Sequence, residues 1–185
     1  MVGIFELWLP ILLSAVFVFA ASSVFHMVLK FHKKDYDKLP DEDRIMASMR
    51  EEKVGPGNFS FPHVQDMKDF GSPEVQEKFK NGPVGFMNVL PNGMPNMGAC
   101  LTQWFVFSIV VGVFVAYLTG RTLDAGTDYL AVFQIAGCVA FMAYGLAEAI
   151  ASIWKAQRWS TTARHMFDGL VYALLTGGTF GWLWP

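Results

Sequence analysis

Hydrophobic residues form four long stretches along this chain, separated by polar segments. A helix that crosses a membrane needs about 20 mostly apolar residues. The stretches cover residues 4–29, 99–118, 129–154 and 162–184, whereas polar residues gather in 30–98. The pattern therefore predicts an all-α fold, a polytopic four-helix transmembrane bundle with a cytoplasmic insertion between helices 1 and 2.

The first stretch is expected to be a membrane anchor rather than a cleaved signal peptide. Its only charge before the apolar core is Glu6, whereas a signal peptide begins with basic residues and has a shorter core. The whole pattern divides the chain into transmembrane helices at 1–29, 99–120, 129–154 and 162–185, a cytoplasmic segment of short helices and turns at 30–98, an external loop at 121–128 and a cytoplasmic loop at 155–161.

Basic residues near the ends of the stretches predict the orientation. Four lysines follow the first stretch, and Lys155, Arg158 and Arg164 lie around the last connection, but Arg121 stands alone on the opposite side. Cytoplasmic loops carry an excess of Lys and Arg. Both polar connections are therefore expected in the cytoplasm, with the N-terminus and the C-terminus outside.

Charge is scarce and unevenly distributed. Only 16% of the residues are charged and the net charge is −2, against about 25% charged residues in an average soluble domain. This excludes an ordinary soluble domain and a nucleic-acid binder. Cys100 and Cys138 lack the spacing of a zinc site or a disulfide framework. The expected partners are the lipid bilayer and either a protein partner or a second copy of the chain.

Small residues recur at close to four-residue spacing in three of the predicted spans. In lipid, helices associate where small side chains let their backbones approach. Three such ladders in one chain indicate a tight bundle rather than a wide pore. The predicted packing residues are Ser108, Gly112, Ala116 and Gly120; Ala136, Ala140, Ala143, Ala147 and Ala151; and Gly169, Ala173, Gly177 and Gly181.

Two imidazoles and two carboxylates from three predicted spans lie in one layer near the cytoplasmic boundary. These residues are His26, Glu148, His165 and Asp168. Ionisable groups inside a membrane are costly and mark functional sites. Two histidines and two acids suit iron, manganese or zinc, so the layer is a candidate metal site. A haem with His26 and His165 as axial ligands is a second hypothesis.

The same layer has two further interpretations. It can be a structural polar cluster, in which Arg164 or Lys30 neutralises the acids and Tyr144 and Tyr172 donate hydrogen bonds to them. It can also be a proton or ion relay in a small proton-coupled carrier that uses Glu148 and Asp168. The two remaining histidines, His32 and His63, fall in predicted loops and receive no role.

Two segments carry a resemblance to known sequences. One is FHKKDYDKLPDED at residues 31–43, and the other runs from FDGL at 167–170 to the closing GWLWP at 181–185. Together they resemble a group of small uncharacterised bacterial membrane proteins with four predicted transmembrane helices. The resemblance implies a bacterial cytoplasmic (inner) membrane; it implies no activity and carries over no functional residue.

The sequence favours a non-catalytic function. It contains no nucleophile beside a histidine in a known pattern, no phosphate-binding loop and no dinucleotide fingerprint. We expect an accessory or interaction subunit of a membrane complex, with no cofactor favoured. The alternatives are a metal- or haem-binding redox membrane protein and, as a second alternative, the proton-coupled carrier.

Overall fold

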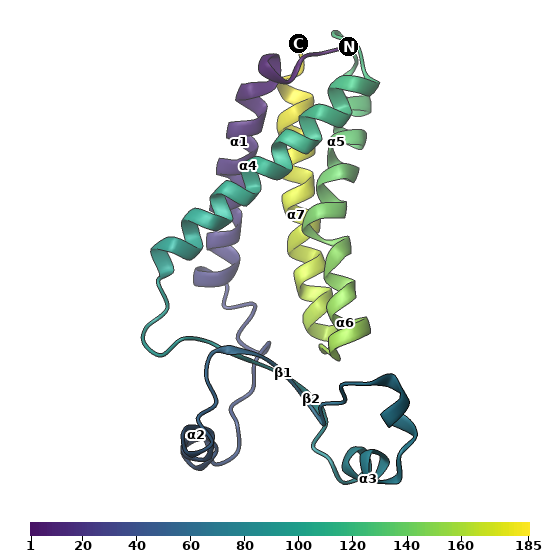
Figure 1. Cartoon of the computed structure of the whole chain (residues 1–185). Coiled ribbons are helices and arrows are strands. Elements are labelled where there is room, and N and C mark those ends of the chain that lie inside the picture. Colours follow the sequence, from purple (N-terminus) through teal and green to yellow (C-terminus); the bar gives the residue numbers. More distant parts are fainter. The chain divides into compact units, whose positions relative to one another are not determined.

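The structure, a computed structural model, describes all residues from 1 to 185 and divides them into two units (Figure 1). The helical unit joins Met1–Tyr36 to Asn96–Pro185, and the inserted unit is Asp37–Pro95. The division follows the change from apolar to polar sequence, and the inserted unit is shorter than the predicted insertion at 30–98, because both ends of that segment belong to the helical unit.

Three helical segments of the helical unit are long and apolar enough to cross a membrane. The structure therefore confirms a mostly helical fold and three of the four expected spans as candidates. They are Ile4–Val28 (η1, Ile4–Leu7; α1, Trp8–Ser23; η2, Val24–Val28), Met97–Thr122 (α4) and Tyr129–Lys155 (α5, Tyr129–Tyr144; η4, Leu146–Glu148; α6, Ala149–Lys155).

The helix predicted as the fourth span, α7 (Trp159–Trp182), does not belong to this apolar group. It has 24 residues, which is long enough to span. Arg164, His165 and Asp168 lie in its first half and lower its mean hydropathy. In the helical unit α7 packs against both α1 and α5 (Figure 1).

Glycines allow the helices of this unit to approach closely. A Cβ atom added to Gly169 of α7 would lie 2.4 Å from the Cα of Gly145, and one on Gly177 would lie 2.8 Å from a backbone oxygen of α5. Similarly, a Cβ on Gly112 of α4 would lie 3.2 Å from the side chain of Ile11 in α1. The small residues of α4 and α7 thus lie where backbones meet.

The alanine ladder of α5 faces the bundle only in its first half. Ala136 and Ala140 are fully buried, but Ala143 and Ala147 are exposed. The buried stripe keeps its four-residue spacing and continues to Tyr144, after which the helix is interrupted by η4. Ala143 is exposed because the predicted ladder takes a three-residue step from Ala140, whereas the buried stripe takes a four-residue step to Tyr144; Ala147 lies beyond the interruption, in η4.

Both ends of the chain lie at the same end of the helical unit, beside the loop between α4 and α5 (Figure 1). The Val2 N–H donates to the Gly120 carbonyl at 2.9 Å, and the Trp184 indole N–H donates to the Asp124 carbonyl at 3.0 Å. The Met1 amino group also pairs with the Asp124 carboxylate. The path of the chain therefore starts and finishes on one side.

The inserted unit contains a two-stranded antiparallel sheet as well as helices. The sequence predicts its helices, and Ser72 caps α3 by accepting a hydrogen bond from the Val75 N–H, as expected for a Ser-Pro helix start. The strands, paired from Gly57↔Val89 to Phe61↔Gly85, are not predicted. The elements are α2 (Glu42–Glu51), β1 (Gly57–Phe61), η3 (Met67–Gly71), α3 (Pro73–Asn81) and β2 (Gly85–Val89).

We expect Gly169→Ala to destabilise the helical unit by about 1 to 3 kcal/mol, because the new methyl group would overlap the α5 backbone. The measurement is reversible unfolding in detergent. Gly178→Ala, on the same helix, is the matched control, because its Cβ would meet its nearest neighbour at an ordinary 3.5 Å. Equal stability of the two variants would contradict the close α5–α7 contact.

Candidate metal centre

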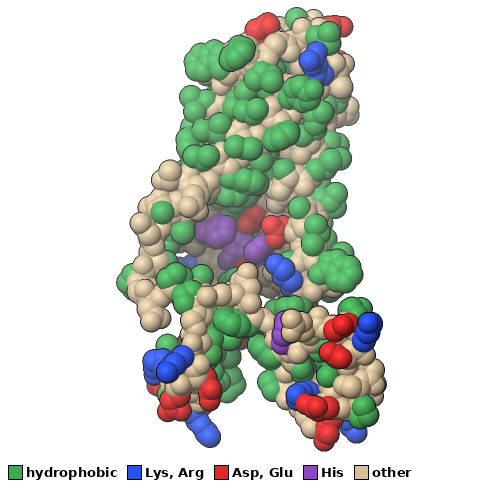
Figure 2. All heavy atoms as spheres, in the orientation of Figure 1, with side chains coloured by type: hydrophobic (Ala, Val, Ile, Leu, Met, Phe, Trp, Pro, Cys, Tyr) green, Lys and Arg blue, Asp and Glu red, His purple; other side chains and the backbone are tan.

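Polar chemistry in the helical unit is concentrated near one end. Figure 2 shows hydrophobic side chains over most of the visible surface of this unit, with histidine and acidic side chains gathered in a recess near that end. The residues involved are His26, His32, Asp35, Glu148, Arg164, His165 and Asp168.

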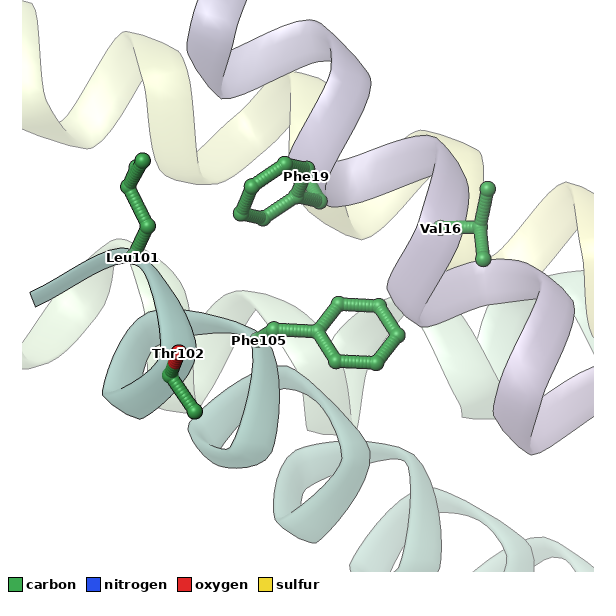
Figure 3. Close-up of a pocket in the computed structure, with 5 residues that line it drawn as sticks. All are labelled: Val16, Phe19, Leu101, Thr102 and Phe105. Atoms are coloured by element: carbon green, nitrogen blue, oxygen red, sulfur yellow. The ribbon is translucent and has the colours of Figure 1, made fainter. Parts of the chain in front are cut away.

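The grooves on the flanks of the unit, by contrast, are apolar. One groove of about 310 Å³ lies between α1 and α4 (Figure 3) and is lined by Val16, Phe19, Leu101, Thr102 and Phe105. Its single hydroxyl, on Thr102, already donates to the Gly98 carbonyl at 2.9 Å. This groove therefore offers no group for catalysis or metal binding.

The polar end is built where the first helix stops and the chain turns back. The helix finishes in the π-helical turn η2, and Lys30 then adopts a left-handed backbone conformation with φ of 51°. The turn brings His32 back onto His26, so that the two rings stack at 4.4 Å with an interplanar angle of 12°. π-Helical turns of this kind are frequent at functional sites.

His32 bridges two buried carboxylates. Its Nδ1 lies 2.6 Å from Asp35 Oδ2 and its Nε2 lies 2.7 Å from Asp168 Oδ2. The two carboxylate side chains are only 5% exposed and the His32 ring 13%. Each of these short contacts holds one proton between a ring nitrogen and a carboxylate oxygen. His32 therefore links the two acids through one ring.

Besides His32, three nitrogen atoms lie within hydrogen-bond distance of the buried Asp35 carboxylate. The Arg164 guanidinium donates to Oδ1 from Nε at 2.8 Å and also from a terminal nitrogen, and His165 Nε2 lies 3.3 Å from Oδ2. Burial alone would raise the pKa of the Asp35 carboxyl, but the hydrogen bonds from Arg164, His32 and His165 outweigh it and lower that pKa below its ordinary value. Asp35 is thus an anion that fixes the ring of His32.

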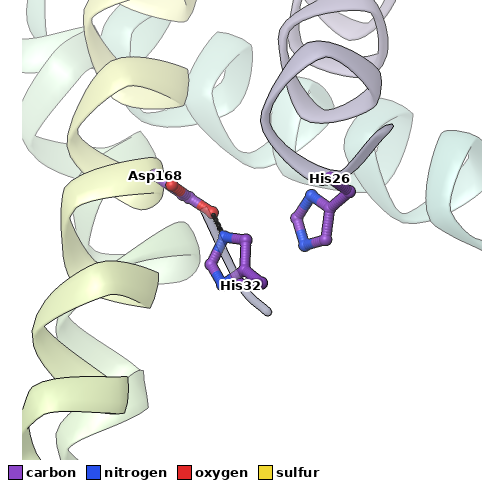
Figure 4. Close-up of side chains that lie close together, drawn as sticks. All are labelled: His26, His32 and Asp168. Carbon is purple, nitrogen blue, oxygen red and sulfur yellow. Dashed lines mark hydrogen bonds and ion pairs between the residues drawn. The ribbon is translucent and has the colours of Figure 1, made fainter. Parts of the chain in front are cut away.

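His26 presents a free nitrogen to the same place. Its Nδ1 lies 2.9 Å from the backbone oxygen of Ser22 and donates to it, which leaves Nε2 as an acceptor without a partner in the chain. Ligand atoms of His26, His32 and Asp168 lie within 4.8 Å of one another (Figure 4). Two imidazoles and one carboxylate at this separation form a candidate three-ligand metal site.

Asp168 has one oxygen that the chain leaves unsatisfied. Its Oδ2 accepts from His32, but its Oδ1 is buried and has no hydrogen-bond partner. A buried carboxylate oxygen without a partner is costly and needs a cause, such as an ion or a water molecule. The carboxylate that belongs to the first trio is therefore the one acid of this end with an unused buried oxygen.

A second trio, His32, Asp35 and His165, also has its ligand atoms within 4.8 Å of one another. Here the Arg164 guanidinium occupies Asp35 Oδ1. A fixed positive charge on a ligand opposes the binding of a cation. The first trio, which contains no arginine contact, is therefore the better candidate.

The structure separates the four residues of the layer predicted from the sequence. His26 and Asp168 join one trio, whereas Glu148 lies beside His165, with 3.4 Å between Oε2 and Nδ1. Glu148 is far more exposed than Asp168, at 40% of its side chain. The layer is thus a three-residue group, in which Asp168 is buried, His32 half-buried and His26 exposed, with a looser pair beside it.

The hypothesis of a structural polar cluster gave Glu148 and Asp168 partners that differ from those in the structure. Arg164 pairs with Asp35, not with Glu148 or Asp168. The Tyr144 hydroxyl donates to the Ser108 carbonyl at 3.5 Å, and the Tyr172 hydroxyl is buried without a partner. Neither tyrosine therefore has a hydrogen bond to the acids.

The arrangement favours a metal ion over haem. A haem held by His26 and His165 needs these rings on opposite faces of a macrocycle with only iron between them. Both rings instead contact His32, at centroid distances of 4.4 Å and 5.1 Å. The space that the macrocycle requires beside these histidines is filled by a third ring.

Sequence reasoning missed the two central residues, His32 and Asp35. Each lies in a loop, where hydrophobic periodicity gives no information. One signal could have identified them: the spacing His-x-x-Asp occurs at 32–35 and at 165–168 in the helical unit, and a third copy at 63–66 lies in the inserted unit. The structure brings the two copies of the helical unit together, because each aspartate contacts His32.

Comparison with protein-family models, with curated proteins and with solved structures gives no match for this chain.

We expect Asp35→Asn to remove an acid-dependent part of the stability. A carboxyl whose pKa is lowered in the folded state stabilises the fold above the unfolded value, near 4, and this stabilisation is lost as the pH falls through the folded value. Unfolding in detergent from pH 6 down to pH 3 should show this loss in the wild type and a weaker one in the variant. Asp43→Asn, on an exposed site of the inserted unit, should behave as the wild type. An unchanged pH dependence in Asp35→Asn would contradict the role of this carboxylate.

Proposed function

We propose that this chain is an integral membrane protein of the accessory type that binds one divalent transition-metal ion through His26, His32 and Asp168. The observation that carries the proposal is the orientation of the two imidazoles. Each has its Nδ1 engaged, His26 with the Ser22 carbonyl and His32 with the Asp35 carboxylate. Metal-binding histidines almost always donate their second N–H to such a carbonyl or carboxylate, which orients the ring toward the ion.

The donor set narrows the identity of the ion. Two imidazole nitrogens and a carboxylate suit Zn²⁺, Fe²⁺ or Mn²⁺, whereas Ca²⁺ and Mg²⁺ prefer oxygen ligands alone. Three protein ligands leave at least one coordination position open. Binding also replaces the proton that His32 Nε2 shares with Asp168, so that one proton leaves as the ion enters.

The metal site is tested with purified protein in nanodiscs, titrated with Zn²⁺ against a chromophoric chelator and with Co²⁺ as an optical probe. We expect one ion per chain. His26→Gln and Asp168→Asn each remove a ligand. Each should weaken metal binding by at least about 10-fold, because mutation of a residue that only supports a ligand already has an effect of that size.

His63→Gln is the matched control, because it removes a histidine that lies in the inserted unit and contacts Ser60 alone. It should bind as tightly as the wild type. Failure of the wild type to bind Zn²⁺, Fe²⁺ or Mn²⁺ would overturn the proposal, as would equal losses in all three variants. Circular dichroism of each variant separates lost binding from lost folding.

We further propose that α7 is the fourth span, in a bacterial cytoplasmic membrane with both chain ends outside. The mean hydropathy of α7 is low because it averages a polar face and an apolar face. Its polar side chains Thr162, Asp168 and Thr176 are buried, whereas the exposed positions include Leu170 and Leu174. The position of both chain ends beside the α4–α5 loop also requires an even number of crossings (Figure 1). The basic residues after α1 and α6 support the orientation.

This topology is tested by labelling single cysteines in intact cells with a membrane-impermeant maleimide, after Cys100 and Cys138 are changed to serine. Ala125→Cys and Pro185→Cys should react from outside, and Lys155→Cys should react only after the cells are opened. A protected Pro185→Cys beside a reactive Ala125→Cys would show that α7 does not cross.

A further inference from the structure

The outer face of α5 carries a polar side chain that the fold leaves without a partner. Gln134 is exposed, and its amide has no hydrogen bond within the chain. It is the only amide in α5, a helix with no charged residue, and it lies five residues, or about 7 Å, past Tyr129 at the start of the helix. An amide that enters a hydrocarbon environment without a hydrogen bond is disfavoured, because it loses its bonds to water and gains none.

Gln134 is the second member of an exposed ridge along α5. The ridge has a four-residue spacing and consists of Leu130, Gln134, Cys138 and Met142 in α5, followed by Leu146 in η4. Rows at this spacing are the ridges by which one helix packs into the grooves of another.

A groove lies directly beside the ridge. It has a volume of about 380 Å³ and runs between α5 and α7, with the small residues Gly137 and Ala173 between larger walls that include Phe141, Leu170 and Leu174. Two of the ridge residues, Gln134 and Cys138, form one of its edges. Ridge and groove therefore belong to one continuous surface.

We infer that two copies of this chain associate through this surface, each inserting its α5 ridge into the groove of the other, with the two Gln134 amides hydrogen-bonded to each other across a two-fold axis. A two-fold interface uses the same patch twice, so the patch must be complementary to itself. A surface with an adjacent ridge and groove meets this condition in shape. Gln134 meets it in chemistry, because an amide is both donor and acceptor.

Other occupants of the groove leave the amide unsatisfied. A lipid acyl chain fits the apolar walls but has no group that bonds to Gln134. In membranes, interhelical hydrogen bonds from glutamine are among the contacts that hold helices together. The second copy is the occupant that fills the groove and also pairs the amide, and this inference does not depend on metal binding.

Cys138 can be used to cross-link this interface, because it lies one turn from Gln134 on the ridge. In Cys100→Ser protein reconstituted in liposomes, oxidation should link two copies through Cys138. The matched control is Val113→Cys in a background without Cys100 and Cys138. Val113 is exposed on α4, nine residues from the end of its helix, as Cys138 is nine residues from the start of α5. It should give no link.

Single-molecule photobleaching of labelled protein at increasing dilution in the liposomes measures the association itself. We expect a dimer that Gln134→Leu weakens by about 3- to 20-fold, the range of single interhelical hydrogen bonds in membranes. Gln134→Asn, which keeps the amide, should lose less. Leucine on a lipid-facing position does not threaten folding of the monomer.

Three results would overturn the inference: a monomer at all dilutions with lipid retained in the groove, equal cross-linking through Val113→Cys and Cys138, or unchanged association in Gln134→Leu. The last result, with a dimer still present, would assign the interface to another face of the chain. Zn²⁺ binding in the same preparations distinguishes failure of this inference from failure of the metal site.

Discussion

The organisation of the polar end depends on one buried charge, the carboxylate of Asp168. A carboxylate inside an apolar bundle is costly unless a partner neutralises it. The hydrogen bond to its Oδ2 comes from His32, which lies on a loop and not on a neighbouring helix. The chain after η2 must therefore turn back onto α7, and the left-handed backbone at Lys30 is where it does so. The stacking of His32 on His26 follows from that turn.

The ion pair between Asp35 and Arg164 attaches the same loop to α7 at a second point. Arg164 is on α7, one turn before Asp168, so both ends of the His-x-x-Asp segment of the loop are fixed to a single helix. Asp35 is matched by the Arg164 guanidinium, and Asp168 shares a proton with His32. An ion that entered beside His26 would replace the His32 proton and leave the Asp35–Arg164 pair in place. The loop would then be fixed by the ion where it is now fixed by a proton.

The sequence predicts the parts of this structure that depend on local pattern. The apolar stretches predict α1, α4 and the segment Tyr129–Lys155 because length and hydropathy alone determine them. The β1–β2 pairing joins Gly57 to Val89, and no local signal encodes a partner so far along the chain. His32 was missed for the same reason, because its role arises from a contact 136 residues away in sequence. His26 and Asp168 could be found, since each is an ionisable residue within a predicted span.

Asp168 and Gln134 present the same physical problem with two different outcomes. Each is a polar group on a helix that is otherwise surrounded by apolar side chains or lipid, and each needs a partner to offset the loss of water. Asp168 faces inward, where a loop of the same chain can reach it. Gln134 faces outward on the α5 ridge, where no segment of the helical unit reaches it. A loop of the chain reaches Oδ2 of the inner acid, but no segment reaches the outer amide, so in the inferred dimer the partner of Gln134 comes from the second copy.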